Sequence, residues 1–333
     1  MTTTFATFRS RCWLAAPAIA LSLNVWAGPS YTVIDLGALG GVNVSYPMGI
    51  NQNGRVVGYT VLANNGIGDR ATLFSGSGGA NLNLGTLGGA NGYAYSINGS
   101  GGIVGYAYTT AGAPHATQFI VSGGSNVDLG TLGGFNSAAQ SINNGGQVVG
   151  EAYTTGNAAV RATLFSTSGG PNVDLGTLGG KDSSAFAIND NGQVVGYAAD
   201  VNGANRANRA TLFSTTGGAN IDLGKLANGD FSIAYAVSNS GQVVGETYTP
   251  YSQFQYLKPW AQRATLFSTS GGTPVDLGTL GGTNSRAWDN NNLDQVVGMA
   301  QLASQEWDAF IWQNGVMTSL ESLIDPTSGW NFY

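Results

Sequence analysis

The chain repeats one unit six times, and this repetition constrains its fold more than any other feature. The clearest phrase of the unit is D-L-G-T-L-G-G, which occurs as three full copies and three variants. In chain order, these begin at Asp35, Asn83, Asp128, Asp174, Asp222 and Asp276. The starting positions are 48, 45, 46, 48 and 54 residues apart. A period of this length is too long for one coil of a β-solenoid and matches a four-stranded propeller blade.

Two further phrases occur in a fixed order within the units. The phrase I-N-x-x-G-x-V-V-G is seen at 142–150 and 188–196, and related copies end at Gly58, Gly105, Gly245 and Gly298. The phrase R-A-T-L-F begins at Arg70, Arg161, Arg209 and Arg263, and its place is taken in units two and six by His115 and Asp308. Because the repeated Arg and Asp residues come once per unit, we interpret them as structural groups that satisfy one another or backbone groups at the blade edges.

Each unit has the punctuation of four short strands. In unit three, strands are predicted at 138–143, 147–154, 161–166 and 172–175, with a turn at 144–146. The strands carry Val, Ile, Tyr, Phe and Leu, and the turns carry residues that tolerate a positive φ. One such sheet cannot bury both of its faces alone, so neighbouring blades must stack. We expect the shared core to include Val148, Leu164, Phe165, Leu175 and their counterparts.

The two ends of the array bear on the number of blades. The segment 31–36 has the form of a fourth strand without the three before it, while 317–324 supplies a fourth strand for unit six. The last residues, 329–333, have the form of the start of a further unit. The fold class predicted is therefore an all-β propeller of about 45-residue, four-stranded blades, with six blades or with seven of which the last is incomplete. The second arrangement is favoured, and it implies a C-terminally truncated chain.

Composition excludes some partners and structures. Charged residues are only 9% of the 333-residue chain while glycine supplies 52 residues, which argues against a fold built on long salt-bridged helices. The formal charge is −6, and no run of Lys or Arg occurs. Nucleic acid is excluded as a main partner, because its binding normally rests on a basic surface.

The N-terminus has the pattern of a secretory signal peptide over 1–27. Arg9 and Arg11 precede an apolar stretch at 13–23, and the small-residue cleavage pattern 25–27 follows. We expect export to the exterior or the cell surface, and a mature chain, 28–333, that forms a single propeller-like domain. Cys12 is the only cysteine and lies in the removed segment, so disulfides cannot hold the mature fold together. No apolar run of the length of a membrane span follows.

The three phrases together resemble the HAF family of bacterial extracellular repeat proteins. The similarity covers roughly 31–324 and depends on the recurrence of D-L-G-T-L-G-G, I-N-x-x-G-Q-V-V-G and R-A-T-L-F in the same order. It implies export and a repeat architecture, and it brings no established activity and no catalytic residues. The chain departs from the pattern at Lys225-Leu-Ala-Asn, in a long insertion after Tyr248, and at its abrupt end.

Candidate catalytic and metal sites have structural explanations. His115 is the only histidine, but it stands where four other units carry Arg, so we interpret it as a structural residue at the start of a strand. The turns 189–192 and 51–54 offer oxygen ligands beside a glycine, but they lack the full set of carboxylates of a dedicated calcium loop and are interpreted as β-turns. No cofactor and no metal site are predicted.

Binding residues are expected where the repetition fails. The connection from the second to the third strand and that from the fourth to the next first strand emerge on the same face of a propeller. On this face, the ligand-binding candidates are Tyr251, Phe254, Tyr256 and Trp260 of the unit-five insertion, together with Lys181, Asp182, Asp230 and Arg286. Aromatic rings supply stacking area at low entropy cost. Covering of a blade edge or a subunit contact is an equal explanation for the four aromatic residues.

Two function classes remain open at the level of sequence. The first is a non-catalytic binding or surface-interaction module for carbohydrate or another extracellular protein. The second is a secreted polysaccharide hydrolase or lyase that uses Asp182 and Asp230 as a carboxylate pair across the central opening. A binding module is the preferred interpretation, and a purely structural role is the third possibility.

Overall fold

The computed structural model confirms an all-β chain. It describes residues 4–5, 31–41, 44–62, 68–76, 78–201, 208–227, 229–250, 260–269, 272–325 and 329. Over this part of the chain, the helical elements are three single-turn 3-10 helices, η1 (Leu39–Gly41), η2 (Thr155–Asn157) and η3 (Glu321–Leu323). Most of the segment predicted as a signal peptide lies outside the described residues. Of residues 1–27, the structure describes only β1 (Thr4–Phe5).

Six antiparallel sheets of four strands follow one another along the chain, one for each repeat. Sheet one consists of β3 (Ser45–Ile50), β4 (Val56–Thr60), β5 (Arg70–Phe74) and β6 (Leu82–Gly85). Sheet two consists of β7 (Gly88–Ile97), β8 (Ile103–Thr109), β9 (Pro114–Phe119) and β10 (Val127–Asp128). Sheet three consists of β11 (Gly133–Ile142), β12 (Val148–Thr154), β13 (Val160–Phe165) and β14 (Val173–Asp174). Sheet four consists of β15 (Gly179–Ile188), β16 (Val194–Asp200), β17 (Asn208–Phe213) and β18 (Ile221–Asp222). Sheet five consists of β19 (Phe231–Val237), β20 (Val243–Pro250), β21 (Trp260–Phe267) and β22 (Val275–Asp276). Sheet six consists of β23 (Gly281–Asn290), β24 (Val296–Leu302), β25 (Trp307–Gln313) and β26 (Val316–Ser319).

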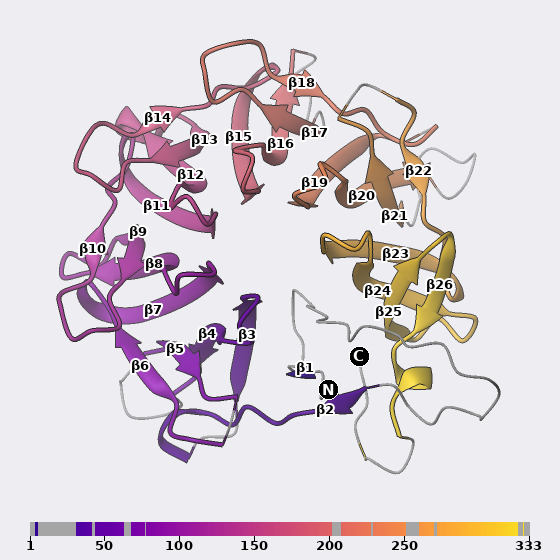
Figure 1. Ribbon diagram of the computed structural model, residues 1–333. Coiled ribbons are helices and arrows are strands. Elements are labelled where there is room, and N and C mark those ends of the chain that lie inside the picture. Colours follow the sequence, from indigo (N-terminus) through magenta and orange to yellow (C-terminus); the bar gives the residue numbers. More distant parts are fainter. Residues whose placement is uncertain are drawn as a thin grey trace.

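The sheets stand around a common centre, and the first strand of each is the innermost (Figure 1). Consecutive strands are neighbours in every sheet, so each unit is a simple meander. The six sheets are hydrogen-bonded internally and do not merge into one closed sheet. Between sheet six and sheet one lies β2 (Thr32–Val33) (Figure 1). The architecture is therefore propeller-like, with a repeat of about 45 residues per sheet.

The first strands begin earlier than the sequence pattern predicted. In sheet three the strand starts at Gly133, because Gly133 pairs with Thr154 at the far end of β12 across an irregular stretch of the ladder. The same pairing places Lys181 and Asp182 inside β15 and Arg286 inside β23, rather than in the connections that precede these strands. Only Asp230 of the four precedes its strand, β19. The other three predicted strands of unit three agree with the structure to within one or two residues.

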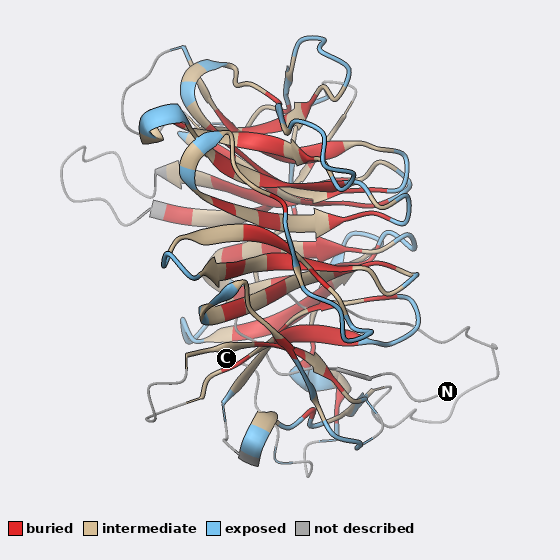
Figure 2. Ribbon diagram, turned by 90° about the vertical axis from the view of Figure 1, so that its left-hand side faces the viewer, coloured by how far each residue is buried: buried red, intermediate tan, exposed pale blue. Residues whose placement is uncertain are grey.

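The core lies between neighbouring sheets, as the stacking argument predicted. Val104 of β8 belongs to the same buried cluster as Val148 of β12 and Phe165 of β13. Burial of a side chain of this size contributes about 1.5–3 kcal/mol. Leu164 is only partly buried and packs toward the next sheet. Buried residues run through the middle of the sheets, and exposed residues lie at the turns (Figure 2).

The glycine of the V-V-G phrase is required by a close approach of two backbones. A Cβ atom built on Gly150 would lie 2.0 Å from the carbonyl oxygen of Ala138 in β11. The equivalent Gly196 has its neighbouring carbonyl oxygen, that of Ser184, at 1.9 Å. No side chain fits such a gap, so the repeated glycine sets how closely the first and second strands pack.

The segment before η1 joins the two ends of the ring by packing. Tyr31 and Val33 pack against the buried cluster of sheet six that includes Leu320, whereas Leu36 is buried with Phe74 of sheet one. The side-chain amide of Asn81 donates to the carbonyl oxygen of Leu36 at 2.9 Å. β2 itself pairs in parallel with β1 and with no strand of sheet six. Side-chain contacts rather than a shared ladder therefore bridge the gap among the described residues.

Candidate functional site

The aromatic insertion of unit five is largely outside the described residues. Tyr251, Phe254 and Tyr256 belong to the part that the structure does not describe, and only the backbone of Trp260 is described. Trp260 pairs with Pro250 at the end of β20, the same end of a sheet at which the first strands begin. The backbone of Trp260 thus lies at the expected end of the ring.

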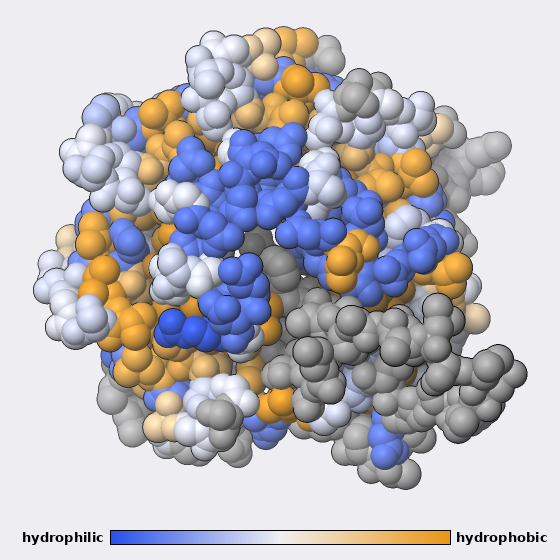
Figure 3. Space-filling view, viewed as in Figure 1, coloured by the Kyte–Doolittle hydropathy of each residue, from blue (hydrophilic) through white to orange (hydrophobic). Residues whose placement is uncertain are grey.

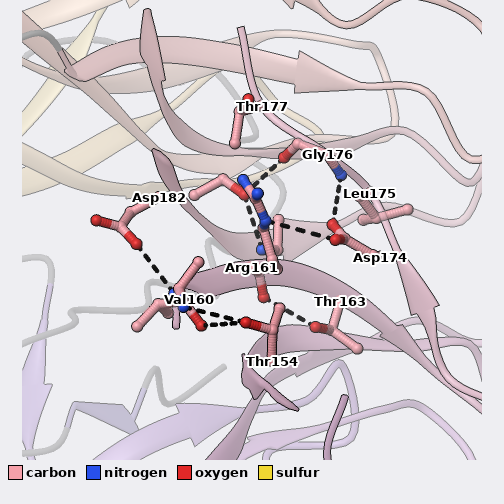
Figure 4. Close-up of polar contacts among 12 residues, drawn as sticks. Thr154, Val160, Arg161, Thr163, Asp174, Leu175, Gly176, Thr177 and Asp182 are labelled. Carbon is pink, nitrogen blue, oxygen red and sulfur yellow. Dashed lines mark hydrogen bonds and ion pairs between the residues drawn. The ribbon is translucent and has the colours of Figure 1, made fainter. Parts of the chain in front are cut away.

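The repeated Arg and Asp residues form a clamp between successive sheets (Figure 4). Arg161 in β13 lies with Nε 3.5 Å from Asp174 Oδ2 in β14, and its Nη1 donates to the carbonyl oxygen of Lys181 in β15 at 2.6 Å. Arg209 and Arg263 make the corresponding ion pairs with Asp222 and Asp276. The structural interpretation is confirmed for Arg161, Arg209 and Arg263, because each contacts the Asp of its own unit and a backbone carbonyl oxygen in, or directly before, the next first strand. Arg70, whose unit carries Asn83 in place of the Asp, donates to the carbonyl oxygen of Ala90 in β7.

His115 occupies the same place in sheet two. Its Nδ1 lies 2.8 Å from Asp128 Oδ2, and β9 and β10, which carry the two residues, are the outer strands of the sheet. The histidine therefore substitutes for Arg in the clamp, as its position in the repeat predicted.

The polar candidates Asp182 and Asp230 have unlike surroundings. Asp182 Oδ1 accepts a hydrogen bond from the backbone N–H of Val160 at 3.0 Å, so this carboxylate joins sheet four to sheet three (Figure 4). Asp230 is exposed, and its carbonyl oxygen accepts from Arg209 Nη1 at 2.7 Å. Lys181 is also exposed and contributes its carbonyl oxygen to the clamp of Arg161. The Asp182 side chain and the backbone carbonyl groups of Lys181 and Asp230 therefore take part in the joints between sheets, while the side chains of Lys181 and Asp230 stay predicted binding residues.

Arg286 belongs to a buried polar cluster between sheets five and six. Its Nε lies 3.3 Å from Oε2 of Glu246, a residue that is only 1% exposed. Glu246 Oε1 also accepts from the hydroxyl of Tyr235 at 2.6 Å, and the Arg286 guanidinium lies 5.6 Å from the ring centre of Trp288. Arg286 Nε further donates to Gln262 Oε1 at 2.6 Å. Arg286 was among the residues predicted from the sequence, whereas Glu246 was not, because it follows the V-V-G phrase just as its partly buried counterpart Glu151 does.

Burial dominates the electrostatics of this cluster. It raises the pKa of the Glu246 carboxyl, although the charge of Arg286 and the hydrogen bonds from Tyr235 and Tyr248 act in the opposite direction. Burial and the neighbouring Glu246 also raise the pKa of the Tyr235 hydroxyl far above its ordinary value. The cluster thus holds a carboxyl group whose charged form is disfavoured.

A cavity lies on the ring axis at the end opposite to Trp260. It measures about 300 Å³ and is lined by the turns between the first and second strands of all six sheets. We call it the axial cavity, and one lining residue from each sheet defines it: Gln52, Gly99, Asn144, Asp190, Asn239 and Asn292. Hydrophilic residues gather around the central opening of the ring (Figure 3). Of the predicted binding residues whose side chains the structure describes, Lys181, Asp182, Asp230 and Arg286, none lines this cavity.

Hydrogen bonds around the axial cavity run from each sheet to the next. The backbone N–H of Gly99 donates to Asn144 Oδ1 at 2.7 Å, that of Asn144 to Asp190 Oδ1 at 2.8 Å, and that of Asp190 to Asn239 Oδ1 at 2.9 Å. The N–H of Asn239 continues the series to Asn292 Oδ1 at 2.8 Å. The turns are therefore structural joints, and their oxygen atoms are engaged in hydrogen bonds.

The asparagine of the I-N phrase adds a second, buried series. Asn98 Nδ2 donates to the carbonyl oxygen of Asn143 at 3.0 Å, and Asn143 Nδ2 donates to that of Asn189 at 3.0 Å. Gly192 ends its turn with a φ of +77°, as expected of a β-turn glycine. In the described part of the chain, no three His, Cys, Asp or Glu side chains gather in a way that could hold a metal ion.

Asp190 is the charged residue of the rim. Partial burial favours its neutral form, but hydrogen bonds from the Asn144 backbone, from the Asn239 side chain and from the Asn144 side chain outweigh this effect and lower its pKa. Its Oδ2 accepts from Asn144 Nδ2 at 2.9 Å and from Asn239 Nδ2 at 2.8 Å. The rim therefore carries a stable negative charge.

The fold and the axial cavity together define a β-propeller-like repeat protein. No protein-family model matches the chain, and no curated protein matches it. Among solved structures, it is similar to a puromycin-hydrolysing peptidase of Mycobacterium tuberculosis, with a TM-score of 0.51 and 10% identity, over 86% of this chain and 46% of that chain. An acylaminoacyl peptidase of Pyrococcus horikoshii matches with a TM-score of 0.34 and 10% identity, over 86% of this chain and 54% of that chain. The chain thus spans about half the length of each.

This similarity corrects the preferred interpretation of function. The preferred interpretation from the sequence was a non-catalytic binding or surface-interaction module for carbohydrate or another extracellular protein. The ring shape recurs in a peptidase, so the fold does not mark a non-catalytic module. The engagement of Asp182 with a backbone N–H also gives no support to the carboxylate pair of the alternative, a polysaccharide hydrolase or lyase. In the part of the chain that the structure describes, no helix is long and apolar enough to cross a membrane.

Proposed function

We propose that this chain is the propeller part of a hydrolase of the peptidase class, and that its axial cavity receives a segment of the substrate. The observation that carries the proposal is the similarity to a peptidase over 86% of the chain. The exposed amide of Gln52 at the rim offers a hydrogen-bond donor and an acceptor to a peptide, whereas the Asn144 and Asn239 side chains are engaged in the joints between sheets.

Under this proposal, the chemical step belongs to residues other than those that line the axial cavity. A hydrolase of this class needs a nucleophile with an adjacent base. The only histidine, His115, is paired with Asp128 on the outer strands of sheet two, away from the cavity lining. The propeller's part is to admit and hold the substrate, while a catalytic unit supplies the nucleophile and the base.

Three further expectations are carried into the proposal. We propose that the ring has seven positions, with 31–36 as the outer strand of the seventh, since Asn81 contacts Leu36 as Asn126 contacts Leu84 in the next joint. We also propose membership of the HAF repeat proteins on the three recurring phrases. Export from a bacterium rests on the signal-peptide pattern at 1–27.

The test compares two preparations of the same tagged chain. One is produced alone in a heterologous host, and the other is recovered from the culture medium of the native host. Both are assayed for release of coumarin from aminoacyl and tripeptidyl coumarylamides. The expected result is hydrolysis by the native preparation alone. Equal hydrolysis by the heterologous preparation would place the catalytic residues in this chain, and no hydrolysis by either would remove the hydrolase proposal.

A matched pair of variants tests whether the substrate enters through the axial cavity. Gln52→Trp adds bulk to the rim of the cavity at an exposed side chain. Thr167→Trp adds the same side chain to the exposed turn between β13 and β14, away from the axis. Hydrolysis of the tripeptidyl substrate is expected to fall with Gln52→Trp and to persist with Thr167→Trp. Equal rates for the two variants would contradict an axial entry.

A further inference from the structure

Several Asn-Gly pairs occur in the turns and strands of the ring, and their surroundings differ. In such a pair the backbone nitrogen of the glycine can attack the side-chain amide of the asparagine, because glycine has no side chain to hinder the approach. The attack requires that both the amide group and the glycine N–H be free to move. The pairs within the described residues begin at Asn53, Asn91, Asn98, Asn144, Asn191 and Asn314.

Most of these pairs are held at the attacking nitrogen. In four of the described pairs the glycine N–H donates a hydrogen bond of 2.7–3.0 Å; these glycines are Gly54, Gly92, Gly99 and Gly192. The asparagine side chains of the same pairs are also engaged. Those of Asn53, Asn98 and Asn191 donate to backbone carbonyl oxygens of the next sheet, and Asn91 Oδ1 accepts from a backbone N–H at 2.8 Å.

Asn144 is held at its side chain instead. Its Nδ2 donates to Asp190 Oδ2 at 2.9 Å, and its Oδ1 accepts from the N–H of Gly99 at 2.7 Å. Its amide group can turn toward Gly145 only after both hydrogen bonds break, and each contributes about 1 kcal/mol.

Asn314 and Gly315 lack such restraints. They form the exposed two-residue turn between β25 and β26, where Gln313 pairs with Val316. Their φ angles are +53° and +83°, as in the hairpin turns that favour Asn-Gly. Neither the Asn314 side chain nor the Gly315 N–H makes a hydrogen bond with any residue that the structure describes.

We infer that Asn314 is a site of spontaneous deamidation, and that the fold directs this covalent modification to the β25–β26 turn. The Gly315 nitrogen gives its proton to solvent and bonds to Asn314 Cγ, while the bond from Cγ to Nδ2 breaks and ammonia leaves. Water then opens the cyclic imide. Addition at Cγ gives aspartate, and addition at the main-chain carbonyl carbon gives isoaspartate. One water is consumed and one ammonia is released, without oxidation or reduction.

The two products differ in their effect on sheet six. Aspartate suits the turn, since Asp-Gly is favoured there as Asn-Gly is. Isoaspartate lengthens the main chain by one carbon atom, so the two-residue turn no longer matches the pairing of Gln313 with Val316. Beyond the turn, Met317 of β26 and Trp312 of β25 pack against the buried cluster of Phe310. Isoaspartate is therefore expected to loosen the outer strand of sheet six, whether or not the protein takes part in hydrolysis.

The site is tested by incubating the whole folded chain at mildly alkaline pH in water enriched in oxygen-18. Mass spectrometry of its peptides should show label entering at Asn314 at least about tenfold faster than at Asn144, because two hydrogen bonds of about 1 kcal/mol each must first break at Asn144. In urea the two rates should become similar, since glycine follows both residues. Equal rates in the folded protein, or faster labelling at Asn144, would overturn the inference.

The consequence for sheet six is tested with Asn314→Gly. Glycine adopts the positive φ of the turn and has no amide to lose. After long incubation, the wild-type protein should contain isoaspartate at this position and unfold at a lower temperature than fresh protein, whereas Asn314→Gly should keep its melting temperature. An equal fall for the variant would overturn the assignment of this loss to the β25–β26 turn.

Discussion

The backbone N–H of Asn144 donates to Asp190 Oδ1 at 2.8 Å, and its side-chain amide donates to Asp190 Oδ2 at 2.9 Å. The two residues lie in equivalent turns of sheets three and four, 46 positions apart in the chain. One carboxylate therefore joins two repeats at the rim of the axial cavity, and Asn239 of sheet five donates to it as well. The rim is held by contacts between repeats rather than by contacts within them.

Replacing Asp190 by Ala should loosen this rim. The substitution removes the acceptor of three hydrogen bonds, and because the site is exposed we expect a loss of about 1 kcal/mol in the free energy of unfolding at neutral pH. Chemical denaturation measures it. Asp190→Asn, which keeps one acceptor oxygen, should lose less. Equal stability of Asp190→Ala and wild type would show that these bonds contribute nothing in solution.

The lowered pKa of Asp190 predicts that its contribution to the free energy of unfolding depends on pH. Its pKa is lowered in the folded protein, so its contribution to stability is present above the ordinary Asp value of about 3.9 and is lost as the pH falls through the folded pKa. The difference between wild type and Asp190→Asn is therefore expected to shrink on acidification. A difference that stays constant from neutral pH into strong acid would contradict the lowered pKa.

Glu246→Gln should have the opposite dependence on pH. The folded pKa of Glu246 is raised, so stability is lost as the pH rises from the ordinary Glu value of about 4.3 through the folded pKa. Gln has no proton to lose, so the variant should gain stability relative to wild type over this rise in pH. Glu151→Gln is the matched control, because it makes the same change at the equivalent, partly exposed position of sheet three. A relative gain at acid pH would reverse the sign and refute the prediction.

Gly150→Ala should destabilise the protein strongly. A Cβ at this position would lie 2.0 Å from the Ala138 carbonyl oxygen, and relief requires separation of β11 from β12, at a cost of about 3 kcal/mol or more. Gly76→Ala is a suitable control, because its nearest neighbour would lie at 3.8 Å. Thermal unfolding of both variants measures the contrast. Similar melting temperatures would contradict the close approach of the two strands.

His115→Arg should be tolerated. The variant restores the residue of four sister units and keeps an ion pair with Asp128, whose side chain is 42% exposed, so the free energy of unfolding should change by less than about 0.5 kcal/mol. Any peptidase activity of the native preparation should also be retained, since His115 lies in the outer clamp of sheet two. Loss of activity with an intact fold would assign the histidine a chemical role.

The sequence by itself determined the repeat, the strands and the joints that recur in every unit. The period set the four-stranded unit, the alternation of Val, Ile and Phe set the strands, and the once-per-unit Arg and Asp predicted the clamp seen between Arg161 and Asp174. These features are local or repeat at one spacing, so a pattern is enough to find them. The early start of the first strands was missed because Gly133 and its equivalents have little strand preference of their own.

Only the tertiary structure decided what happens on the axis and between particular sheets. Asn290 is the one polar residue among the described strand ends that line the axis, because the other five first strands end there with an aliphatic residue. Glu246 is distinguished from its counterparts by Arg286 of the next sheet, which lies against it. Such contacts join residues about one repeat apart or more, and their geometry depends on how the sheets are tilted around the centre. Hydrophobic patterning selects a strand and its buried face, but it contains no information about which side chains meet across the ring.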